Sequence, residues 1–161
     1  MIDTLHLFRP LQEKLHELLT GLQPADWDKK TVAGVWTVKD VTAHLLDVTL
    51  RDISMYRDTW ELPPADPKNY TDLIAYLNRI NADWVSAMRR VSPQILVEWL
   101  HQSQEDYIHC LERLDPNATS KYSVAWAGEQ TSANWFHVAR NTLKCGTINS
   151  KSGMQSGYQA S

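Results

Sequence analysis

Apolar residues recur along most of this chain at spacings of three and four, and this period restricts the possible fold more than any other feature. It is typical of amphipathic helices that each bury one stripe. Because no convincing run of alternating apolar and polar residues competes with it, the sequence predicts an all-α protein. The first stripe, within residues 2–22, consists of Leu5, Phe8, Leu11, Leu15, Leu18, Leu19 and Leu22.

Proline and capping residues predict where the first two helices begin and end. Pro10 would remove an interior hydrogen bond, so the first helix either kinks there or starts nearer Arg9, and it ends at Gly21 or soon after. Thr37 and Asp40 form a capping box, with Asp in place of the usual Glu, that starts a helix over 38–56. The prolines in 61–69 prevent that helix from continuing.

Three further helices are predicted. One spans 70–91 and should bury Leu73, Leu77, Ile80, Trp84 and Met88. Ser92 and Pro93 open another, which reaches about Leu114 and buries Leu96, Leu100, Tyr107, Ile108 and Leu111. After a long loop, with a short extended piece at 122–126, Thr131 or Ser132 caps a last helix to Leu143 or Cys145. We therefore expect one helical-bundle domain over 1–145 and an irregular polar tail over 146–161.

Size and charge exclude several classes of protein. A chain of 161 residues needs only one core. The net charge of −3, without long charge runs, predicts no binding to nucleic acid or to an anionic membrane. The sequence has neither a signal peptide nor an apolar run of about 18 residues, so we expect a soluble, cytoplasmic protein. Cys110 and Cys145 lie far apart and are interpreted as bystanders.

His44 is the most informative of the six histidines. It shares a helical stripe with Val41, Leu45 and Val48, so its ring should point into the bundle, with Asp47 and Arg51 nearby in the sequence. A buried imidazole needs a hydrogen-bond partner or a metal. Spacing alone leaves both open: a satisfied core histidine or a metal ligand.

A second polar series, His101, Glu105 and His109, recurs every four residues. Successive helical turns are about 5.4 Å apart, whereas zinc lies about 2.0 to 2.2 Å from its donors. His101 and His109 therefore cannot readily share one ion, although either could share one with Glu105. The series is interpreted mostly as a solvated face. His6 and His16 are likewise interpreted as surface residues. The sequence contains no P-loop, dinucleotide-binding glycine motif or nucleophile elbow.

Four segments resemble a known family: LFRPLQEKL, DWDKKTVAGVWTVKDVTAHLLDVTLRDIS, PPADPKNYTDLIAYLNRINADW and SVAWAGEQTSANWFHVAR. Together they make residues 2–140 similar to the DinB/YfiT-like superfamily, near the N-terminal domain of mycothiol-dependent maleylpyruvate isomerase. The resemblance implies a four-helix bundle in up-down-down-up order, often a homodimer, with a long loop before the last helix. It also implies a zinc or nickel ion that lowers the pKa of a bound thiol cofactor or water.

The resemblance also implies which side chains hold the ion. The first ligand would be His44, and two more, four residues apart, would come from the last helix in a stretch resembling EYTExWHHQQQIRDAVG. Here the chain reads NTLKCGTINSKSGMQSG after Arg140, with Lys144 and Ile148 at the ligand positions. Ile has no donor atom and Lys is a poor ligand unless deprotonated. His137, about one turn earlier on the same helix, is a weak candidate to replace a lost ligand. The alternative is that His137 is exposed or lines the mouth of the pocket.

The genetic code suggests how the ligands were lost. Regrouping the codons from Asn141 one nucleotide earlier permits the string EYTEMWHHQQQIRDAVG in full. We therefore hypothesise a one-nucleotide frameshift, natural or introduced in cloning or sequencing, against the alternative of a genuinely divergent tail.

Two functions follow from the sequence. One is a metal-dependent, thiol-linked transferase or isomerase of unknown substrate, with an incomplete metal site in this chain. The other is a non-catalytic bundle that acts by dimerising or by binding a partner, with no cofactor bound.

Overall fold

The computed structural model describes residues 4–60 and 68–115, and the helices in these ranges carry the fold. They are α1 (Phe8–Thr20), α2 (Val38–Tyr56), α3 (Tyr70–Met88) and α4 (Pro93–Glu112). Short 3-10 turns at Leu5–Leu7 and Pro24–Asp26 precede and follow α1, and the described residues contain no β-strand. The prediction of an all-α bundle is confirmed. The predicted last helix and polar tail lie outside the described residues.

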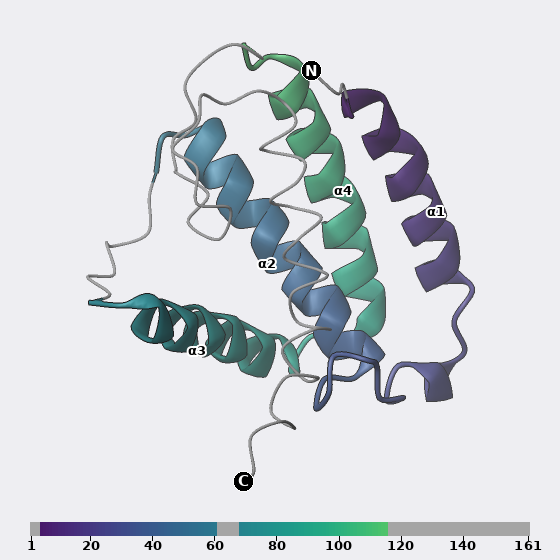
Figure 1. Ribbon diagram of the computed structural model, residues 1–161. Coiled ribbons are helices and arrows are strands. Elements are labelled where there is room, and N and C mark those ends of the chain that lie inside the picture. The colour runs from purple at the N-terminus through teal and green to yellow at the C-terminus, as the bar shows by residue number, and fades with distance from the viewer. Residues whose placement is uncertain (1–3, 61–67, 116–161) are drawn as a thin grey trace, which may run out of the picture.

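Helices α1, α2 and α4 stand side by side, whereas α3 lies crosswise at one end of α2 (Figure 1). Arg9 pairs with Glu105 and Glu112 while His16 stacks on His101, so α1 and α4 are antiparallel. Helices α2 and α4 are parallel, because the early part of each shares one core cluster and the late part another. With the crosswise α3 not counted, α1, α2 and α4 run up, down and down, as in the first three positions of the expected order. The fourth position falls outside the described residues.

The larger core cluster lies where α2 and α4 meet the end of α1. Its fully buried members include Leu46, Leu96 and Leu100, and Trp84 of α3 packs against it. The Trp84 indole N–H donates to the Ala43 carbonyl oxygen at 2.9 Å, which connects α3 to α2. Burial of these side chains, at about 25 cal/mol per Å² of apolar surface, supplies the main stabilisation of the bundle.

Capping residues start the helices as the sequence predicts. The Thr37 hydroxyl accepts a hydrogen bond from the Asp40 amide at 3.2 Å, and the Asp40 carboxylate accepts one from the Thr37 amide at 3.1 Å. Ser92 caps α4 in the same manner through the Ile95 amide. The capping box at Thr37 also positions the first turn of α2, and hence His44 two turns later.

Asp40 has a second role, because Arg89 at the end of α3 donates two hydrogen bonds to it, at 3.0 and 3.1 Å. Burial of the Asp40 carboxyl acts to raise its pKa, but the hydrogen bonds from Arg89 and Thr37 outweigh burial, so its pKa is lowered. A buried carboxylate thus fastens the end of α3 to the start of α2.

Two predicted helices differ from the structure in detail. The first helix begins at Phe8, so Pro10 falls in its first turn and no kink is needed. Of the two alternatives, a kink at Pro10 or a start nearer Arg9, the second is therefore confirmed. The prediction that Leu11 and Leu18 are buried is wrong, since they are 52% and 62% exposed. Only α4 among the described helices packs closely along α1, so part of the leucine stripe has no neighbouring helix within residues 4–60 and 68–115.

The third helix ends at Met88, three residues earlier than expected. Its predicted stripe of Leu73, Leu77, Ile80, Trp84 and Met88 is only half-buried, and Val85 is instead the fully buried residue. The crosswise placement of α3 explains the difference, because a helix that crosses its neighbour contacts it over a short length.

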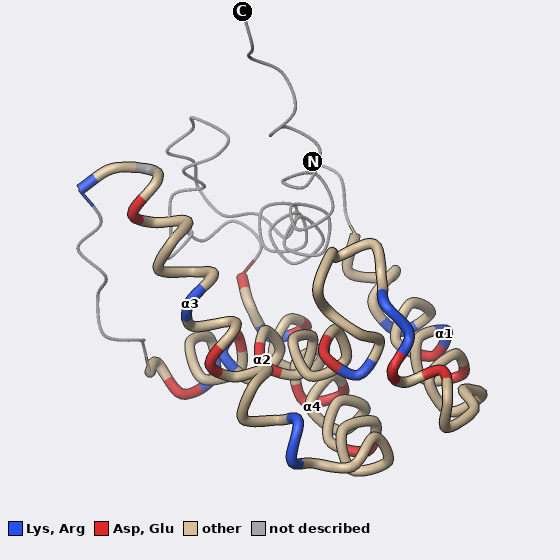
Figure 2. Tube along the Cα trace, turned by 90° about the horizontal axis from the view of Figure 1, so that it is seen from below, with Lys and Arg blue, Asp and Glu red and all other residues tan. Residues whose placement is uncertain are grey.

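Figure 2 shows Lys and Arg interspersed with Asp and Glu along the described helices. No helix among the described residues has the length and apolar character needed to cross a membrane.

Candidate functional site

His44 lies inside the bundle on α2, with only 5% of its surface exposed. The interior position predicted from its stripe is confirmed. Its Nδ1 atom is buried and has no hydrogen-bond partner among the described residues. Burial, with a smaller effect from the nearby Arg51 cation, lowers the pKa of His44 to about 4. The imidazole is therefore neutral at physiological pH, which is the form that binds metals.

A loop before α2 brings an aromatic ring against His44. The Thr31 amide donates to the Trp36 carbonyl oxygen at 3.0 Å, and Gly34 adopts a positive φ of 76° that allows the turn between them. This turn places the Trp36 ring 4.9 Å from the His44 ring, centroid to centroid. Trp36 shields one side of the imidazole from water, a contact that the spacing of residues within α2 could not reveal.

Next to His44 on α2, an ion pair joins Asp47 and Arg51 at 2.8 Å. Arg51 also donates to the Asn81 side-chain oxygen of α3 at 3.0 Å. Burial raises the pKa of Asp47, and the pairing with Arg51 opposes that rise. Asp47 is thus held by Arg51, and the charged neighbours that the sequence placed near His44 pair with each other.

The described residues supply one donor of the three that the family resemblance implies. No group of three His, Cys, Asp or Glu side chains within residues 4–60 and 68–115 lies close enough together to hold a metal ion. His137, Lys144 and Ile148 lie outside the described residues. By residue type, Lys144 and Ile148 do not fit the donor set that the family resemblance implies.

The second polar series lies partly at an interface between helices. Glu105 accepts a hydrogen bond from the Gln12 amide nitrogen at 2.7 Å, and Gln12 is buried. His101 is half-buried and stacks on His16, with 4.2 Å between ring centroids. The interpretation of this series as a solvated face is wrong for His101 and Glu105, because α1 covers that side of α4. It holds for His109, which is exposed.

The same contacts correct the interpretation of His16, which is half-buried in the contact with α4 rather than a plain surface residue. His6 is exposed as expected, and Cys110 is a buried free thiol.

The burial of Gln12 was not predicted from the sequence. A polar residue on the same face as Phe8, Leu15 and Leu19 was the available signal.

Asp52 near the end of α2 is a titratable residue that the sequence did not single out. Burial raises its pKa to about 6, although a hydrogen bond with Tyr107 and the Arg51 cation act in the opposite direction. A group whose pKa is higher in the folded state stabilises the fold fully below its unfolded pKa, and this contribution is lost as pH rises through about 6.

We therefore expect Asp52→Asn to be more stable than the parent chain at pH 8, on the order of 2 kcal/mol, and similar to it near pH 4. Asn keeps the oxygen that can accept from Tyr107 but carries no charge. Urea unfolding of both proteins at the two pH values measures the difference. His44 titrates with the opposite sign, so only the difference between the proteins isolates Asp52. A stability difference independent of pH would contradict the prediction.

The family model of the mycothiol maleylpyruvate isomerase N-terminal domain matches residues 8–143. No curated protein matches the chain. No solved structure matches it either. The family match spans most of the chain, includes His44 and stops one residue before Lys144. The chain belongs to the mycothiol maleylpyruvate isomerase N-terminal domain family.

Proposed function

We propose that this fold serves metal-dependent, thiol-linked transferase or isomerase chemistry, and that the present chain carries only the α2 half of the metal site. One observation carries the proposal: a neutral, buried imidazole whose Nδ1 has no partner among the described residues. Buried polar atoms are nearly always paired, so an unpaired one in a bundle interior supports a role as a ligand.

The other half of the site depends on the end of the chain. A zinc site has at least three protein donors, and two residues four apart on a helix that faces His44 could supply two of them. Lys144 and Ile148 cannot be that pair. The end of the family match at residue 143 supports a change of reading frame shortly before it. Sequencing the source gene tests this, since a gene that lacks the alternative frame would exclude a frameshift.

Metal analysis of the purified chain tests the proposal. We expect much less than one zinc or nickel ion per chain after dialysis, and the same low content in His44→Gln, because one imidazole does not retain an ion. Elemental analysis by mass spectrometry measures both. One tightly held ion per chain that His44→Gln removes would show instead that the present chain has a complete site.

A second candidate is a non-catalytic bundle that works by forming a homodimer or binding a partner. The exposed leucines Leu11 and Leu18 of α1, with the exposed Leu7 just before this helix, favour it. Sedimentation equilibrium on the same metal-analysed sample separates the two candidates. A metal-free protein that is a stable dimer, and whose reading frame is genuine, would favour the second candidate.

A further inference from the structure

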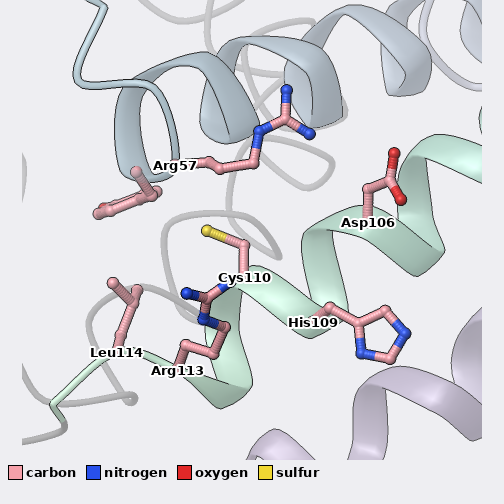
Figure 3. Close-up of a pocket in the computed structure, with 7 residues that line it drawn as sticks. Arg57, Asp106, His109, Cys110, Arg113 and Leu114 are labelled. Carbon is pink, nitrogen blue, oxygen red and sulfur yellow. The ribbon is translucent and has the colours of Figure 1, made fainter.

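A cleft of about 350 Å³ lies between the end of α2 and the last turns of α4 (Figure 3). Tyr56 and Arg57 line it from the α2 side, and the α4 side is lined by Asp106, His109, Cys110, Arg113 and Leu114. His44 precedes Arg57 by 13 residues on α2, which corresponds to about 20 Å along a helix at 1.5 Å per residue. The cleft is therefore separate from the candidate metal site.

The two arginines at this cleft differ in what they contact. Arg57 donates to both carboxylate oxygens of Asp58, at 2.8 and 3.0 Å, so its charge is largely compensated. The Arg113 guanidinium makes no ion pair or side-chain hydrogen bond with residues 4–60 or 68–115. Within residues 4–60 and 68–115, Arg113 is thus the cation lining this cleft that has no carboxylate partner.

The remaining walls indicate what kind of anion fits. Tyr56 and Leu114 supply apolar surface, and both pack against the smaller core cluster. Arg57 and Arg113 both act to lower the pKa of the Cys110 thiol, which places this thiol near both cations, although burial raises its pKa overall. A planar guanidinium can bind a carboxylate through two parallel hydrogen bonds. A volume near 350 Å³ is at the lower end of the range for small-molecule sites.

We propose that this cleft binds a small organic acid, with its carboxylate on Arg113 and its apolar part against Tyr56 and Leu114. A competing explanation is that Arg113 only complements the carbonyl groups at the end of α4, where a cation is favourable without any ligand. Ligand binding distinguishes the two, because an arginine that only caps a helix creates no saturable site.

Titration of the full chain with benzoate, followed by NMR of the backbone amides, tests the proposal. We expect saturable shifts at the end of α2 and in 106–114, with a dissociation constant in the millimolar range. Arg113→Gln should weaken binding about ten-fold, as expected for loss of a charge-assisted pair. Arg90→Gln, which removes an exposed arginine elsewhere, is the matched control and should leave binding unchanged.

Inorganic phosphate serves as a second probe, since it shares the charge but has no apolar part. Weaker binding of phosphate than of benzoate supports the proposal, and equal binding would overturn it in favour of a general anion site. Absence of saturable benzoate binding, or equal effects of Arg113→Gln and Arg90→Gln, would also overturn it.

Alkylation of Cys110 in a Cys145→Ser background provides an independent measurement. The thiolate displaces iodide from iodoacetate, an anion, or from iodoacetamide, which is neutral. For each protein the iodoacetate rate is divided by the iodoacetamide rate, and this ratio is compared with the same ratio for free cysteine. We expect the ratio of the parent to exceed that of free cysteine several-fold. We expect it to be smaller in Arg113→Gln. A ratio that Arg113→Gln does not change would contradict the role of Arg113.

Discussion

Replacing residues 141–157 by EYTEMWHHQQQIRDAVG is expected to convert this chain into one that holds one zinc or nickel ion per molecule. The replacement supplies a carboxylate at position 144 and an imidazole at position 148, four residues apart, where they can face His44. The ion should be retained because three donors from two helices bind an ion far more tightly than the single buried imidazole of the present chain does. Elemental analysis and isothermal titration with each metal measure the gain.

The matched control is the same replacement combined with His44→Gln, which should lose the ion because only the last helix then supplies donors. A smaller change, Lys144→Glu with Ile148→His, tests whether the two donors suffice in the present tail. We expect it to bind more weakly, since Gly146 and Gly153 remain and glycine is about 1 kcal/mol worse than alanine within a helix. Metal retained after His44→Gln in the replaced chain would contradict the role of His44.

Leu96→Ala is expected to lower the free energy of unfolding by about 3 to 4 kcal/mol. Leu96 is 0% exposed and belongs to the core cluster that joins α1, α2 and α4. Removal of its branched end leaves a cavity between helices that cannot fully collapse, so the lost transfer free energy and the cavity both contribute. Urea unfolding monitored by circular dichroism measures the change.

Ile95→Ala is the control for this prediction, because the neighbouring Ile95 is 39% exposed on the same helix. We expect it to cost less than about 1 kcal/mol, since truncation at a partly solvated position creates no closed cavity. Similar losses for both variants would show that the core between these helices is not packed as the structure has it.

Several features of the fold were predictable because they depend on neighbours in the chain. The bounds of α2 agree with prediction, since the capping box at Thr37 and Asp40 and the prolines after Trp60 act locally. The start of α4 at Pro93 agrees for the same reason. The stripe of α4, including Leu96, Leu100 and Leu111, is buried as its period indicates.

Features that depend on which helix lies beside which were not predictable. The exposure of Leu18 and the burial of Gln12 both follow from how α1 sits on α4, and no periodicity specifies that rotation. The stacking of His16 on His101 joins residues 85 positions apart in the sequence. The half-burial of α3 likewise follows from its crosswise placement.

Some properties of the candidate site were likewise predictable from the sequence, and others were not. The sequence by itself determined that His44 lies on the inner face of a helix, and that Lys144 and Ile148 carry no suitable donors, because periodicity and side-chain chemistry are properties of the chain. Only the tertiary structure decided that Trp36 covers the imidazole, that Asp47 is held by Arg51, and that burial keeps His44 neutral. Those properties arise from solvent exclusion and from distances between separate segments, which local sequence does not encode.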